Sequence, residues 1–149
     1  MTFKQKVYGQ YLQSLNDKIR LLRTALDDLK ESSSNETKST AGDKHETALA
    51  MLQIEQKNVS QQLKESVDQK VLFERINPNI IKPEAGTGSL LKTSGGYFFL
   101  SIALGKIVVD GITIIAISAR SPLGQKLIGL KVNDTAEIKG TRYVVENIS

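Results

Sequence analysis

Apolar residues recur every three or four positions along the first part of the chain. They are Val7, Tyr11, Leu15, Ile19, Leu22, Leu26 and Leu29. This spacing puts them on one face of a helix, in a stripe of coiled-coil type. A weaker second stripe, interrupted by Gln56, consists of Leu49, Leu52, Val59, Leu63 and Val67. The pattern therefore predicts two helices that fold back as an antiparallel hairpin of about 40 Å, at about 1.5 Å per residue.

The stretch between the two stripes, residues 31–42, is polar and rich in Ser and Thr, and it does not favour a continued helix. The tip of the hairpin is therefore expected near residues 32–46. Asn77-Pro78 then sets a boundary, because the residue before a proline disfavours helix. We expect two domains, residues 1–76 and residues 77–149.

The second half has a different pattern, with short apolar runs separated by glycine turns. The runs predict six strands, at residues 89–93, 97–104, 106–109, 112–117, 135–139 and 142–148. One short helix is expected between Ser121 as its N-cap and Gly129 as its left-handed stop, with Pro122 in the first turn. The fold class is therefore α+β, with a helical hairpin followed by a small antiparallel sheet that carries one helix.

Composition narrows the function classes. The chain of 149 residues has no Cys, which excludes disulfides and thiolate sites, and its single His excludes a His-rich metal site. No apolar run is long enough for a membrane span and the first residues lack a signal-peptide pattern, so a cytoplasmic location is expected. The net charge of +4 is spread without a basic stripe, which argues against sequence-specific DNA binding.

The usual enzyme motifs are absent, and one constellation remains at the start of the second helix. Asp43 and Glu46 are three residues apart, so both carboxylates lie on the same side of the first turn. One interpretation is a capping box, with Asp43 as N-cap and Glu46 three positions later. The other is a carboxylate pair that supplies oxygen ligands to a Mg²⁺ ion. Two carboxylates alone hold Mg²⁺ weakly, so such a pair would act inside another protein's active site.

Three segments resemble the bacterial transcript-cleavage factors GreA and GreB. Residues 117–129, Ile-Ser-Ala-Arg-Ser-Pro-Leu-Gly-Gln-Lys-Leu-Ile-Gly, are similar to the family's Ile-Ser-x-x-Ser-Pro…Leu-Ile-Gly signature. Residues 131–134, Lys-Val-Asn-Asp, are similar to its Lys-Val-Gly-Asp turn, with Asn133 in place of Gly. Gly42-Asp43-x-x-Glu46 is similar to the acidic motif at the family's coiled-coil tip.

The resemblance implies an FKBP-like C-terminal domain and a bacterial RNA polymerase as partner, with backtracked RNA contacted only indirectly. Residues Ser121, Pro122, Leu123 and Gly124 would dock on the polymerase. Asp43 and Glu46 would enter the secondary channel and help to hold a Mg²⁺ ion of the polymerase. The chain would then need no cofactor of its own and would not be an enzyme, because the polymerase performs the hydrolysis.

Two other functions stay open. Lys44, Thr47 and the polar stretch before Gly42 depart from the family's tip, and they favour a regulator or inhibitor that binds the polymerase without cleavage. A coiled-coil interaction module unrelated to transcription is the third hypothesis. It is disfavoured by Gln56, which weakens the second apolar stripe.

Overall fold

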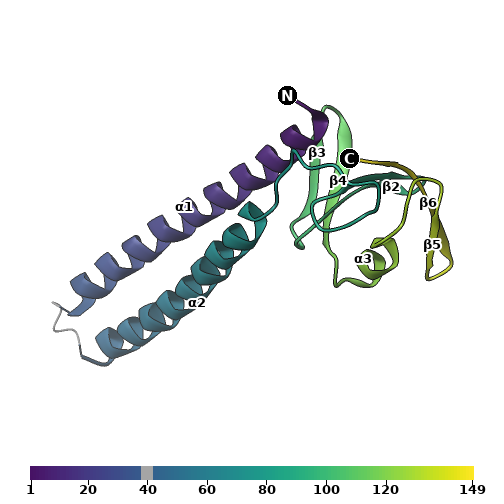
Figure 1. Cartoon of the computed structure of the whole chain (residues 1–149). Coiled ribbons are helices and arrows are strands. Elements are labelled where there is room, and N and C mark those ends of the chain that lie inside the picture. Colours follow the sequence, from purple (N-terminus) through teal and green to yellow (C-terminus); the bar gives the residue numbers. More distant parts are fainter. Residues whose placement is uncertain (38–41) are drawn as a thin grey trace. The chain divides into compact units, whose positions relative to one another are not determined.

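The structure is a computed structural model that describes the backbone of residues 1–37 and 42–149, and the side chains of residues 1–35 and 46–149. Two long helices, α1 (Phe3–Thr37) and α2 (Gly42–Glu74), precede a six-stranded sheet and a short helix (Figure 1). The α+β class is confirmed. The chain divides into two compact units, one formed by Met1–Gln13 with Val71–Ser149 and the other by Ser14–Lys70. The domain limits expected from composition, at residues 76 and 77, stay a prediction.

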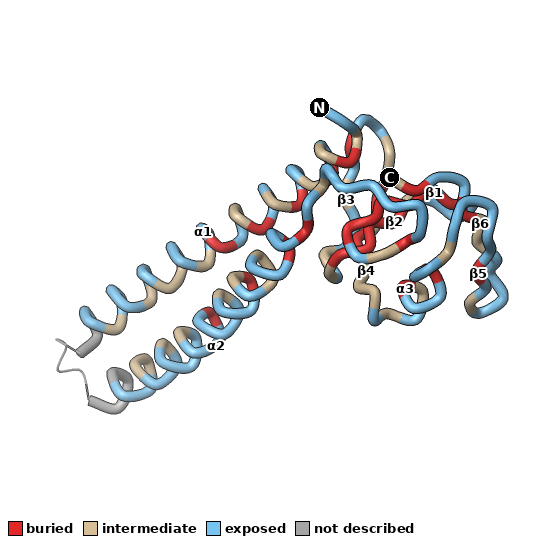
Figure 2. The backbone as a smooth tube through the Cα atoms, in the orientation of Figure 1, coloured by how far each residue is buried: buried red, intermediate tan, exposed pale blue. Residues whose placement is uncertain are grey.

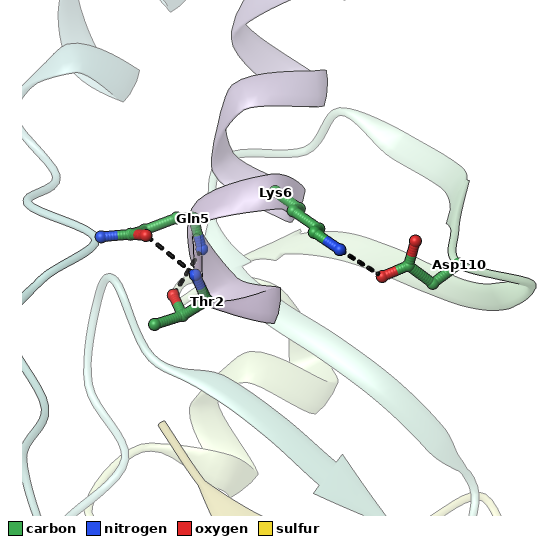
Figure 3. A network of polar contacts seen from close by, with 4 residues as sticks. All are labelled: Thr2, Gln5, Lys6 and Asp110. Carbon is green, nitrogen blue, oxygen red and sulfur yellow. Dashed lines mark hydrogen bonds and ion pairs between the residues drawn. The ribbon is translucent and has the colours of Figure 1, made fainter.

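A reciprocal pair of hydrogen bonds starts α1. The Gln5 N–H donates to Thr2 Oγ1 at 3.1 Å, and the Thr2 N–H donates to Gln5 Oε1 at 2.9 Å (Figure 3). This is a capping box, which satisfies two N–H groups at the helix start that have no partner inside the helix. One turn on, Lys6 forms an exposed ion pair of 3.0 Å with Asp110.

The unit Ser14–Lys70 contains α1 from Ser14 to its end and α2 from its start to Lys70. The first apolar stripe is buried at Leu15 and Ile19, and in α2 Val59 is buried. Gln56 donates across the helix pair to the Leu29 carbonyl at 3.2 Å and to Ser33 Oγ. These bonds join the later part of one helix to the middle of the other, as an antiparallel hairpin requires.

One expectation about this hairpin is wrong. The polar stretch after residue 30 was predicted to leave the helix, yet α1 continues to Thr37 and α2 begins at Gly42. Ser33 is half-buried and receives the hydrogen bond from Gln56. Pairing between helices stabilises residues whose own helix propensity is low, and tertiary packing often outweighs propensity in this way. Residues 38–41 lie outside the described part of the chain.

The six predicted strands are all present in the other unit. They are β1 (Leu90–Thr93), β2 (Gly96–Ser101), β3 (Gly105–Val109), β4 (Ile112–Ser118), β5 (Thr135–Ile138) and β6 (Thr141–Ile148), in the order β3-β4-β2-β1-β6-β5. Two-residue turns connect β3 to β4 at Asp110-Gly111 and β5 to β6 at Lys139-Gly140, and all four turn residues have positive φ. Such turns match the twist of the strands that they connect.

The sheet is mixed, which corrects the expected antiparallel sheet. β4 pairs with β2 in parallel, with Tyr97 opposite Ile114 and Leu100 opposite Ile117. After β2 the chain reverses into β3, but one strand position is left open between them. The tight turn at residues 110–111 then returns β4 into that position, where it runs in the direction of β2. Local alternation of apolar residues carries no information about this insertion.

Both faces of the central strands are buried, and Figure 2 shows buried residues concentrated there. On one face, Leu91, Phe98 and Leu100 pack with Leu127 of α3 (Pro122–Leu127). The neighbouring residues Leu90 and Phe99 are also buried, and their side chains point to the opposite face. This double burial explains the nearly continuous apolar runs of β2 and β4.

Aromatic rings from the ends of the long helices cover the second face. Phe73 stacks on Tyr8 with 4.7 Å between ring centroids and meets the Phe99 ring edge-on at 6.0 Å. The Tyr11 hydroxyl donates to the Gly105 carbonyl at 2.6 Å and lies 3.2 Å from the Ile114 carbonyl. Burial raises the pKa of Tyr11 to about 12, so the phenol is neutral at physiological pH. These contacts belong to the unit that contains the sheet.

Candidate functional site

The predicted carboxylate pair lies in the first turn of α2. The helix begins at Gly42, so Asp43 and Glu46 are both helical and three residues apart. Positions with this spacing lie on the same side of a helix. The Glu46 side chain is exposed. The side chain of Asp43 lies outside the described residues, so the capping-box hypothesis stays a prediction.

The first turn of a helix favours negative charge, because its unpaired N–H groups carry partial positive charge. Carboxylates in this turn are therefore compatible with a stable helix, and an exposed Glu46 is accessible to a partner. Among the residues whose side chains are described, no three His, Asp or Glu side chains gather into a group that could hold a metal ion. Asp43 is not among these residues.

Gln56 of α2, the helix that begins with this turn, forms a hydrogen bond to α1. It lies ten residues after Glu46, which corresponds to about 15 Å along a helix. A single polar residue at a core position of a coiled coil fixes the register of the helices at a cost in stability. In the sequence, Gln56 looks only like a gap in the second apolar stripe. The signal was the position itself, since an amide at a core position needs a partner on the facing helix.

The predicted docking segment, residues 121–124, forms the start of α3. Ser121 is the N-cap as expected, and its Oγ accepts from the Gly124 N–H at 3.0 Å. The same hydroxyl donates to the Ser118 carbonyl at 2.7 Å, which joins the cap to the end of β4. Gly129, the predicted stop, has a φ of 84°. The sequence therefore predicted both ends of this short helix correctly.

The four docking candidates differ in exposure. Pro122 is exposed, Ser121 and Leu123 are half-buried, and Gly124 is buried. A Cβ at position 124 would lie 2.1 Å from the Ser118 carbonyl oxygen. Gly124 therefore has a packing role that accounts for its presence without a partner, whereas Pro122 and the outer parts of Ser121 and Leu123 are the groups available for contact. Their contact with a polymerase stays a prediction.

Asn133 has a positive φ of 78°. Its N–H donates to the Val145 carbonyl at 2.7 Å, and Asp134 accepts from the Lys131 N–H at 2.9 Å. Asn tolerates positive φ better than most residues, which makes it a reasonable replacement for Gly in this turn.

Across the described residues, no helix is long and apolar enough to cross a membrane.

Comparison with models of protein families finds no match. No curated protein matches the chain either. Among solved structures, the chain is similar to GreA factor homolog 1 (Gfh1) of Thermus thermophilus, with 20% sequence identity, a TM-score of 0.35 and coverage of 95% of this chain and 94% of that one. A second structure of the transcription factor Gfh1 gives 20% identity, a TM-score of 0.33 and coverage of 95% and 92%.

Proposed function

We propose that this chain is a Gre-type transcription elongation factor. It binds RNA polymerase, inserts the hairpin end that bears Asp43 and Glu46 into the secondary channel, and stimulates cleavage of backtracked RNA. The observation that carries the proposal is the acidic pair in the first turn of α2, next to the α1–α2 connection. The resemblance of residues 42–46 and 117–129 to the Gre motifs supports it.

The paired helices are suited to place a charge far from their base. The part of α2 within the unit Ser14–Lys70 extends for about 40 Å at 1.5 Å per residue. The buried stripe and the bonds of Gln56 hold the two helices together, so the end of the hairpin is positioned by a paired scaffold. A protein that supplies only two ligands to another enzyme's active site can assist cleavage only if those ligands are held in the correct position.

Carboxylate oxygens are suitable ligands for Mg²⁺, and the exposed Glu46 fits that role. Two carboxylates fill only part of an octahedral shell, so the remaining ligands must come from the polymerase and water. The ion supplies Lewis-acid stabilisation and a more acidic water for phosphodiester hydrolysis. Asp43 and Glu46 contribute negative charge and orientation. The chain itself is therefore a factor of the polymerase and not an enzyme, and it needs no cofactor of its own.

The test uses stalled, backtracked elongation complexes mixed with the purified full-length protein. The wild type should shorten the RNA from its 3′ end. Asp43→Asn and Glu46→Gln should each slow cleavage at least about tenfold, the loss of roughly 1.4 kcal/mol of transition-state stabilisation. Glu55→Gln is the matched control, because Glu55 is also an exposed carboxylate of α2 but lies outside the first turn. Absence of shortening at saturating wild-type protein would refute the proposal.

A second function on the same scaffold is a regulator that binds the polymerase without cleavage. Lys44 adds a positive charge between the two carboxylates in sequence, which favours this function. The polar stretch before the tip no longer supports it, because α1 continues to Thr37. Competition with an active cleavage factor, without RNA shortening, would support this second function. Failure to retain any polymerase in a pull-down would instead favour an unrelated interaction module.

A further inference from the structure

A cavity of about 580 Å³ opens in the unit that contains the sheet. Its lining comes from segments far apart in the sequence, namely Leu72, residues 75–77, Ile80 and Lys82, residues 87–89, residues 101–102 and residues 118–120. These segments are the end of α2 with its following loop, the approach to β1, the end of β2, and the β4–α3 connection. The volume lies in the range of small-molecule sites, which is about 300–1,000 Å³.

Every charged residue in the lining is a cation. Arg75 and Lys82 come from the segment that follows α2, Arg120 comes from the β4–α3 connection, and no Asp or Glu lines the cavity. Within the part of the chain whose side chains are described, none of the three forms an ion pair. Like charges that converge on one concavity raise the local positive potential and attract anions. Two of the three are Arg, whose planar group binds phosphate oxygens in pairs.

Hydrogen bonds fix the backbone of the segments that carry these cations. The Arg120 N–H donates to Ser118 Oγ at 3.1 Å, and Gln125 Nε2 donates to the Arg120 carbonyl at 3.2 Å. On the other side, the Lys4 ammonium donates to the Ile80 carbonyl at 2.8 Å. Lys4 is only 4% exposed, so it anchors the loop that leads to Lys82 from below the surface. The cations therefore extend from ordered backbone rather than from free ends.

The rest of the lining combines aliphatic side chains with the amide of Asn77 and the hydroxyl groups of Thr87, Ser89, Ser101 and Ser118. Leu72 and Ile80 are about half exposed, at 48% and 53%, although both are aliphatic. Buried hydroxyls are present at Ser89 and Ser101. A site that combines aliphatic side chains with placed polar groups suits ligands that carry a charged group on an uncharged body.

We propose that this cavity binds a phosphorylated small molecule of nucleotide size, with its phosphates on Arg75, Lys82 and Arg120 and its uncharged body on the aliphatic side chains. The three cations balance the charge of a diphosphate group. This site is separate from the acidic turn of α2, and the proposal does not depend on a role in transcription.

Isothermal titration of the full-length protein with ADP tests the proposal, with inorganic pyrophosphate and adenosine as separate arms. ADP should bind saturably with a sub-millimolar Kd, pyrophosphate should bind more weakly, and adenosine should not bind. Each of Arg75→Gln and Arg120→Gln should weaken ADP binding about three- to tenfold, and the double variant should abolish measurable binding. Lys106→Gln is the matched control, because Lys106 is an exposed cation of β3 outside the lining.

Three results would overturn the proposal: no saturable ADP binding up to about 5 mM, unchanged binding by the double variant, or adenosine binding as tight as that of ADP. Circular dichroism and urea unfolding of each variant show whether it is folded, so that a loss of binding is not a loss of structure. The titration contains no polymerase, and its outcome leaves the proposed transcription function to be decided by RNA cleavage alone.

Discussion

Replacement of Gly124 by Ala should destabilise the protein strongly, although it adds only one methyl group. The new Cβ would lie 2.1 Å from the Ser118 carbonyl oxygen, whereas real Cβ atoms essentially never come closer than 3.0 Å to another heavy atom. It would also approach Ser121 Oγ to 2.9 Å. Both atoms belong to the contact between β4 and the helix cap, so relief requires α3 to move away from β4.

The expected cost has two parts. Overpacking of a well-filled site costs about 1–3 kcal/mol. Movement of α3 also breaks the bond from the Gly124 N–H to Ser121 Oγ, and loss of an N-cap costs about 1 kcal/mol. The free energy of unfolding should therefore fall by about 2–4 kcal/mol, a large share of the total for a domain of this size.

Urea unfolding followed by circular dichroism measures this change. Gly9→Ala is the matched control, because Gly9 is an exposed residue inside α1 and a Cβ there meets nothing within 4 Å. Alanine is the better helix former, so Gly9→Ala should raise the free energy of unfolding by about 0.5–1 kcal/mol. A Gly124→Ala variant within about 0.5 kcal/mol of the wild type would refute the packing role assigned to this glycine.

Three further predictions rest on contacts elsewhere in the structure. Tyr11→Phe should lower the free energy of unfolding by about 1–1.5 kcal/mol, because two carbonyls lose their hydrogen bond to the Tyr11 hydroxyl. Since the pKa of Tyr11 is raised to about 12 in the folded protein, this stabilisation should persist below pH 10 and decline from pH 10 to 12. Urea unfolding at a series of pH values should show the decline in the wild type but not in the variant. Lys6→Met should change stability by less than about 0.5 kcal/mol in the same assay, because its ion pair with Asp110 is exposed. Gln56→Leu should raise thermal stability and loosen the helix register. Spin labels attached through Asp28→Cys and Lys57→Cys in this cysteine-free chain should then show a broader distance distribution, and an unchanged distribution would contradict a register role.

Local patterns predicted local elements well. The stripe from Val7 to Leu29 predicted α1, and the Ser-Pro start with its Gly stop predicted α3, because capping and periodicity act within a few residues. Apolar runs predicted six strands for the same reason. The parallel pairing of β2 with β4 was missed, since it depends on which strand position the chain leaves open after Ser101.

Interactions between distant residues explain the remaining differences. Residues 31–37 stay helical although their composition disfavours it, and Gln56 supplies a partner from the facing helix. The cavity with its three cations was also not foreseen, because Arg120 is far in sequence from Arg75 and Lys82 and lines the same cavity only in the fold. The acidic pair was predicted from residues close to each other in sequence, and its role in catalysis stays a prediction.

The Mg²⁺ dependence of RNA cleavage tests the central claim most directly. Backtracked elongation complexes are incubated with saturating wild-type or Glu46→Gln protein over a range of Mg²⁺ concentrations, and the rate of 3′ shortening is measured. If Glu46 contributes a ligand, the variant should need about tenfold more Mg²⁺ to reach half of its maximal rate. Superimposable Mg²⁺ curves for the two proteins, with cleavage intact, would contradict the role of this carboxylate in holding the ion.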